Sequence, residues 1–274
     1  MSQPASTARR FTPKLIQPSD EQCAIQVASE RTVIVEANAG AAKTTTLALR
    51  VAESLARNVA VHRLIALTHT QPACVALHNT LVQIGVPRAT VNQIRIQTFE
   101  EFSREILKDI DDHRVDYVDE NEQLRTHFWN AVQRVEEDEG ERWREELNMP
   151  AIGDSWFAEE FLKINARLKG TLRDILERDG RRASPEYAES IGIDYTQLKV
   201  YLAHERIRRQ EHADTPLFRG ETDATYDLAR YFHDGGTTQG LQHWPFSAQI
   251  VLVDEVHDLN YAMFRVLVEV LNTS

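Results

Sequence analysis

A short stretch near the N-terminus restricts the possible folds more than any other. The sequence EANAGAAKTTTL (36–47) continues the β-branched run TVIVEA (32–37) and leads into KTTTLALRVAESLARN (43–58). The apolar residues of that last segment recur with helical spacing at Leu47, Val51 and Leu55. A strand, a loop and a helix in this order are the context in which a loop of the form G-x-x-x-x-G-K-[ST] binds phosphate. We therefore expect an α/β fold with a phosphate-binding loop.

The loop departs from that pattern at both glycines. Ala37 and Ala42 occupy the glycine positions, whereas Gly40, Lys43 and Thr44 are retained. Backbone amides and a helix N-terminus do most of the phosphate binding, so the loop can still work. If Ala42 has a positive φ, its Cβ costs roughly 1–2 kcal/mol, which would weaken affinity about tenfold. Taken alone, the segment also fits an Ala-rich helix start with a surface lysine.

Three further short runs predict parallel strands: RLIALT (63–68), QIRIQT (93–98) and QIVLVDE (249–255). The intervening stretch from 104 to about 240 is amphipathic and charged, with no convincing strand. The last run then rejoins the sheet. This order predicts an α/β core with a parallel sheet, interrupted by a helical insertion subdomain.

The segment IVLVDEVHDLN (250–260) places two carboxylates at the C-terminal end of a strand. Open α/β sheets bind ligands at that edge. We expect Asp254 to hold Mg²⁺ and Glu255 to orient or deprotonate an attacking water. Lys43 would meet the β and γ phosphates of a nucleotide, and the Thr44 hydroxyl would ligate the metal.

Five ordered motifs resemble those of the UvrD/Rep-like superfamily 1 DNA helicases. Besides the loop and the Asp254–Glu255 strand, they are SDEQCAIQ (19–26), similar to the Q motif, LIALTHTQPACVALHNTL (64–81), similar to motif Ia, and IQTFEEFSREIL (96–107), similar to motif Ib. The resemblance implies a RecA-like P-loop NTPase core, domain 1A, over 1–103 and 241–274. It also implies a helical subdomain 1B over 104–240, near whose end TDATYDLARYF (222–232) resembles a short family segment.

The resemblance implies roles for individual residues of an ATP-dependent DNA helicase. Gln22 would read the adenine edge of ATP, and Lys43, Asp254 and Glu255 would be catalytic. The other nucleotide-binding positions would be Ala39, Gly40, Ala41, Ala42, Thr44 and Thr45, with Mg²⁺ on Thr44 and Asp254. Single-stranded DNA would contact Thr68, His69, Thr98 and Phe99.

Several positions depart from the family. They are His69 for Phe, Gln71 for Asn, Pro72 for Lys, His257 for Gln, and Glu100 and Glu101 for His and Ser. A carboxylate facing a DNA phosphate is repulsive, so the motif Ib contact is in question. The sequence also ends before motif III and the second RecA-like lobe, whose arginines face the γ-phosphate. Loss of such an arginine lowers turnover roughly 10³–10⁵-fold, so the resemblance implies poor hydrolysis by this chain without a second lobe in cis or in trans.

Two alternatives remain open. One is a degenerate P-loop module that binds a partner without ATP turnover. The other, disfavoured by the motif Ia and Ib matches, is a small-molecule kinase.

Composition adds limits on location and partners. No apolar run approaches the length of a membrane span, and the two cysteines form no metal-like spacing, so we expect a cytoplasmic protein. The net charge of −11 argues against a surface coated with Lys and Arg, so any DNA contact should be local. The basic segment LAHERIRRQEH (202–212) would either touch DNA backbone or form a solvated face paired with acids. Trp129, Trp143 and Trp156 are expected to pack in the insertion.

Overall fold

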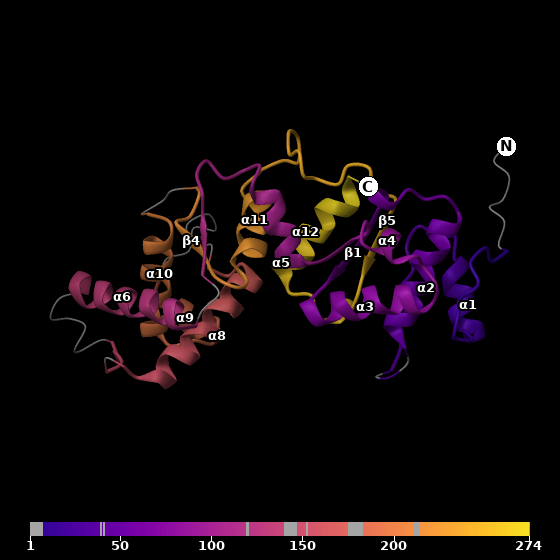
Figure 1. The fold of residues 1–274 in the computed structure, drawn as a ribbon. Helices are drawn as coiled ribbons and strands as arrows, with labels where there is room; N and C mark the ends of the chain where they lie inside the picture. The colour runs from indigo at the N-terminus through magenta and orange to yellow at the C-terminus, as the bar shows by residue number, and fades with distance from the viewer. Residues whose placement is uncertain are drawn as a thin grey trace. The chain divides into compact units, whose positions relative to one another are not determined.

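The chain forms two compact units in a computed structural model (Figure 1). The first contains Met1–Phe102, Trp244–Leu259 and Val268–Ser274, and the second contains Ser103–His243 and Asn260–Leu267. The structure describes residues 8–38, 40, 42–118, 121–139, 147–151, 153–174, 183–210 and 214–273. Each unit has its own hydrophobic core.

A parallel three-stranded sheet organises the first unit. It consists of β1 (Leu64–Thr68), β2 (Arg95–Thr98) and β5 (Ile250–Val253), in the order β2-β1-β5. The strand after the insertion pairs directly with β1, with Leu67 opposite Val253. Three of the predicted strands and the parallel α/β fold are therefore confirmed.

Helices pack on this sheet and bury small and branched apolar side chains. The predicted helix after the phosphate loop is confirmed as α2, in which Leu49 and Val51 share a core with the strand residue Leu64. The helices of the first unit are α1 (Asp20–Val27), α2 (Lys43–Ala56), α3 (Gln71–Gln83) and α4 (Arg88–Val91), and its 3₁₀ turns are η1 (Val61–Arg63) and η3 (Val256–Asp258). Two more helices, α5 (Phe99–Leu107) and α12 (Tyr261–Asn272), contribute residues to both units.

The predicted first strand at 32–37 is wrong. Residues 32–38 have no regular secondary structure, and the side chain of Ile34 is 75% exposed. The β-branched residues of this run favour an extended backbone, but a strand also needs a neighbour to complete its hydrogen bonds. The segment pairs with none of the described strands, so its β-branched residues alone do not make it a strand.

The second unit is built mainly of helices, as predicted for the insertion. They are α6 (Asn121–Glu139), α8 (Ser155–Thr171), α9 (Pro185–Ser190), α10 (Tyr195–Arg208) and α11 (Asp223–His233). Phe128, Phe161 and Leu198 meet in its core. The expectation of no strand is wrong in one detail, because β3 (Asp116–Tyr117) and β4 (Phe218–Arg219) form a two-residue parallel pair. A pair this short leaves no periodicity in the sequence.

The basic segment 202–212 pairs with acids, as one of the two expectations had it, but Arg208 does so in the core and not on a solvated face. Arg208 is fully buried, and its guanidinium donates to the carboxylates of Glu205 and Asp227 at 2.8–3.1 Å. Arg219 bridges Asp227 and Asp111. These arginines are therefore core groups of an ion network and not a solvated or DNA-facing surface. Residues 211–213 lie outside the described residues.

The tryptophans of the insertion differ among themselves. Trp129 packs against the core, as expected. Trp156 does not, because its side chain is 68% exposed at the start of α8. Trp143 lies outside the described residues. Among the described residues, no helix combines the length and the apolar content that crossing a bilayer requires.

Candidate nucleotide site

The C-terminal ends of the three strands bring the predicted site residues to one edge of the sheet. Thr68 at the end of β1 lies opposite Thr98 at the end of β2. On the other side of β1, the amide of Asp254 donates to the carbonyl of Leu67 at 3.0 Å. Because all three strands are parallel, the residues that follow them converge, and ligands bind at such an edge.

The phosphate loop has the left-handed backbone that its usual glycines would favour. Gly40 has φ +81° and Ala42 has φ +55°, immediately before α2 begins at Lys43. Ala42 therefore has the positive φ on which the expected strain of its Cβ depends. Ala42, the N-cap residue, has no side-chain group that could cap this helix start, so the first amides of α2 are suited to bind an anion. Ala39 and Ala41 lie outside the described residues.

Lys43 and Glu255 meet across the site although 212 positions separate them in sequence. The Lys43 ammonium lies 2.7 Å from Glu255 Oε2, and both side chains are partly exposed. This hydrogen bond, with the positive charge of Lys43, holds the pKa of Glu255 below its usual value. Glu255 itself has φ +50°, which turns the chain sharply after β5.

Asp254 is the more buried of the two acids. Its side chain accepts a hydrogen bond from the Glu255 amide at 3.1 Å. Burial and the neighbouring carboxylate of Glu255 raise the pKa of Asp254. Within the described ranges, no group of three or more His, Cys, Asp or Glu side chains is placed to hold a metal ion. The oxygen donors of Asp254 and Thr44 suit Mg²⁺, which commonly takes one or two protein ligands and completes its shell with phosphate and water.

Gln22 lies beside the loop but is already engaged. Its side-chain amide donates to Thr46 Oγ1 at 3.2 Å, and its carbonyl accepts from the Ser19 amide in a capping box of α1. A nucleotide base would therefore compete with Thr46 for the Gln22 amide. Thr44 and Thr45 occupy the first turn of α2 with intermediate exposure.

Glu53 anchors the helix that carries Gln22, and sequence reasoning missed it. Its buried carboxylate accepts from the amides of Arg10 and Phe11 at 2.8–3.1 Å and from the Gln26 side chain at 3.0 Å. Burial opposes ionisation, but these hydrogen bonds outweigh it and lower the pKa of Glu53. The signal in the sequence was an acid one turn after Leu49, on the buried side of α2.

Comparison with protein-family models identifies the family. The UvrD/REP helicase N-terminal domain matches residues 18–274. The chain belongs to the UvrD/REP helicase family. No curated protein matches it. Membership confirms the resemblance and the RecA-like fold class, and it places the chain among the P-loop helicases of superfamily 1, which are ATP-binding and DNA-binding hydrolases.

The positions at which the sequence predicts DNA contacts are mostly buried in this UvrD/REP domain. Thr68 and Phe99 are fully buried and Thr98 nearly so. The Thr68 hydroxyl donates to the Thr70 carbonyl and lies 2.9 Å from Cys74 Sγ. Of the four positions, His69 alone is partly exposed, with its ring centroid 6.2 Å from that of Phe99. The structure thus brings these four residues together without presenting most of them to a nucleic acid.

Two of the residues that depart from the family, Gln71 and Glu101, bind each other. Gln71 donates its side-chain amide to Glu101. Glu101 also accepts from the Thr98 amide at 3.0 Å. The Glu101 carboxylate is therefore engaged within this UvrD/REP domain, as part of the start of α5.

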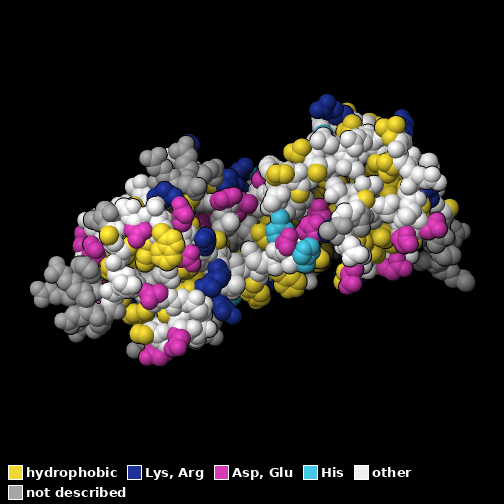
Figure 2. Space-filling model, turned by 90° about the horizontal axis from the view of Figure 1, so that it is seen from below, with side chains coloured by type: hydrophobic (Ala, Val, Ile, Leu, Met, Phe, Trp, Pro, Cys, Tyr) yellow, Lys and Arg dark blue, Asp and Glu magenta, His cyan; other side chains and the backbone are white. Residues whose placement is uncertain are grey.

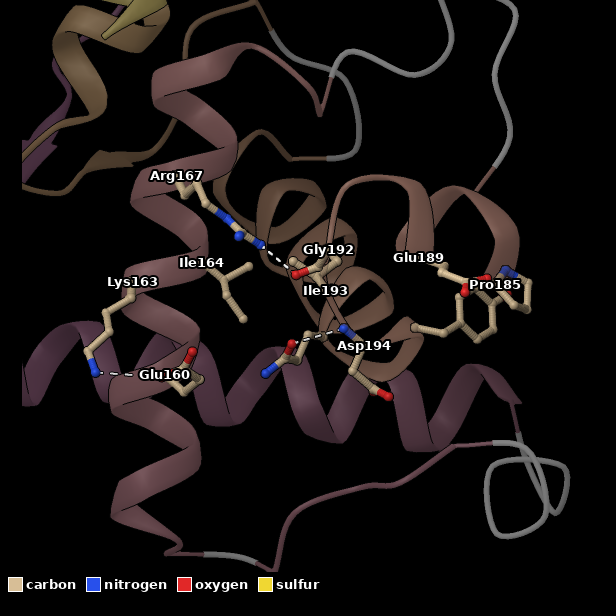
Figure 3. A pocket seen from close by; sticks show the side chains of 11 residues that line it. Glu160, Lys163, Ile164, Arg167, Pro185, Glu189, Gly192, Ile193 and Asp194 are labelled. Carbon is tan, nitrogen blue, oxygen red and sulfur yellow. Dashed lines mark hydrogen bonds and ion pairs between the residues drawn. The ribbon is translucent and has the colours of Figure 1, made fainter. Parts of the chain in front are cut away.

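A cavity of about 560 Å³ lies in the second unit, between α8, α9 and the start of α10 (Figure 3). Arg167 donates to the Gly192 carbonyl across it, and Lys163 pairs with Glu160. None of the predicted site residues lines this cavity.

Proposed function

We propose that this chain is the ATP-binding portion, domains 1A and 1B, of an ATP-dependent DNA helicase or translocase. The observation that carries the proposal is the 2.7 Å pair of Lys43 and Glu255 at the strand ends. It brings the phosphate loop and the acidic strand end together, and a nucleotide site needs both at one place. The uncapped start of α2 adds an anion-binding backbone at the same place.

Each residue then has a distinct task when ATP binds. Lys43 leaves Glu255 and pairs with the phosphates, while the amides at the start of α2 hold the same anion. Thr44 and Asp254 would hold Mg²⁺, which supplies charge neutralisation on the phosphates. Glu255 orients or deprotonates the attacking water. The Gln22 side-chain amide gives up its hydrogen bond to Thr46 and binds the adenine edge.

The proposal includes two partners. One is a second RecA-like lobe, in cis or in trans, that completes hydrolysis. The other is single-stranded DNA through local contacts. Figure 2 shows acidic and basic side chains interspersed on the face in view, which fits local binding better than an extended basic surface.

The test is the metal dependence of nucleotide binding. A fluorescent ATP analogue is titrated into the wild-type chain and into Asp254→Asn, each with Mg²⁺ and with EDTA. We expect Mg²⁺ to tighten binding to wild type and to have little effect on Asp254→Asn. Asp258→Asn is the matched control, because Asp258 is an exposed carboxylate near the same strand end. Equal metal dependence in all three proteins would refute the proposed site.

A further inference from the structure

The Lys43–Glu255 pair raises a question about the bound state. Lys43 is the hydrogen-bond partner of Glu255 in this structure. If Lys43 turns to the phosphates, Glu255 loses its nearest cation. A carboxylate that must orient a water needs a fixed position, so another donor has to hold it.

His69 is placed to be that donor. It follows β1 by one residue, and Glu255 lies two residues beyond Val253, the partner of Leu67. His69 and Glu255 therefore each lie two residues beyond a paired position, just past the ends of two adjacent parallel strands. The Nε2 atom of His69 is buried and makes no hydrogen bond in the part of the chain that the structure describes. A buried polar atom without a partner is unusual and needs an explanation.

Packing agrees with this placement. The buried ring of Phe99 lies beside His69 and limits where the imidazole can turn. His69 is thus packed beside a buried aromatic ring, just past the strand end that neighbours the one carrying Glu255.

His257 is the competing donor, and its surroundings are less suitable. Its Nδ1 atom lies 3.4 Å from Glu255 Oε2, and its Nε2 atom lies 3.4 Å from Asp258. The side chain is 67% exposed. Exposed pairs at such distances contribute little.

We propose that His69 is a positioning residue that receives Glu255 when nucleotide takes Lys43. The imidazole donates from Nε2 to one carboxylate oxygen and leaves the other for the attacking water. This inference rests on the proposed function, and it assigns His69 to the nucleotide site instead of to a DNA base.

A double-mutant cycle tests the exchange. The Kd of a non-hydrolysable ATP analogue with Mg²⁺ is measured for wild type, His69→Phe, Glu255→Ala and the double variant. We expect His69→Phe to weaken binding roughly three- to tenfold when Glu255 is present. In the Glu255→Ala background the same change should have less than about a twofold effect, because no carboxylate remains to be received.

Two further variants separate positioning from general damage. His69→Gln places an amide donor near the Nε2 position and should restore most of the affinity. His62→Phe, which replaces an exposed histidine before the opposite end of β1, should have no effect. Equal losses from His69→Phe in both backgrounds, or no loss in either, would overturn the inference. If wild type itself bound no analogue, the proposed function would fail first, so the two failures are distinguishable.

Discussion

Replacing Ala42 by glycine isolates the energetic effect of the unusual phosphate loop. Ala42 has φ +55° and ψ +40°, the left-handed conformation, immediately before Lys43. An L-residue with a Cβ loses about 1–2 kcal/mol there. Glycine avoids that strain but is more flexible in the unfolded chain, which costs about 0.5–1 kcal/mol. Ala42→Gly should therefore stabilise the protein by up to about 1 kcal/mol.

The effect on nucleotide affinity should be small. The backbone of Ala42 is left-handed in this structure, so we expect binding to add little strain. We expect the Kd for an ATP analogue to change by less than about threefold, which corresponds to about 0.6 kcal/mol.

Gly40→Ala is the matched opposite change. Gly40 has φ +81°, and a Cβ there would meet no atom of the described residues within 4 Å. Only backbone strain is added, so we expect a loss of about 1 kcal/mol. Both variants are measured by urea denaturation and by analogue titration. A tenfold gain in affinity for Ala42→Gly without a change in stability would refute the reasoning, because it would show that the strain arises on binding.

Three further predictions concern the scaffold. Arg208→Met should lose about 3–5 kcal/mol in urea denaturation, because it removes the buried guanidinium that bridges the carboxylates of Glu205 and Asp227. The exposed Arg206→Ala should lose less than about 0.5 kcal/mol, and equal losses would contradict the buried network. Burial opposes the ionisation of Glu205 and Asp227, but Arg208 outweighs it and holds the folded-state pKa values of both acids below their unfolded values. The free energy of unfolding should therefore fall as the pH drops below about 4. A urea midpoint that stays constant from pH 7 to pH 3 would contradict this. Glu53→Ala should lower the free energy of unfolding by about 2–4 kcal/mol. It should also make the chain around Phe11 more sensitive to limited proteolysis, since the Phe11 amide would lose its acceptor. Unchanged cleavage would refute the anchoring role.

Local sequence patterns predicted the parts of the fold whose cause is local. The β-branched runs that include Thr68, Thr98 and Val253 are strands, and the amphipathic segment from Lys43 is a helix. The run at 32–37 failed because a strand depends on a hydrogen-bonding neighbour that periodicity does not reveal.

Tertiary contacts account for what sequence reasoning missed in the site. The motifs predicted that Lys43 and Glu255 share one edge of the sheet, and the structure pairs them. They did not reveal that Glu53 anchors α1, because its partners lie far away in sequence. The burial of Arg208 was also hidden, since a basic helical segment has the same composition whether its charges face water or buried acids.

The central claim is that Lys43 binds the phosphates of ATP at this sheet edge. The most direct measurement is the equilibrium Kd of a fluorescent ATP analogue with Mg²⁺ for wild type, Lys43→Ala and the control Lys108→Ala, whose lysine is exposed. We predict saturable binding to wild type and Lys108→Ala and a loss of at least about tenfold in Lys43→Ala. Equal affinity of all three proteins would contradict the claim.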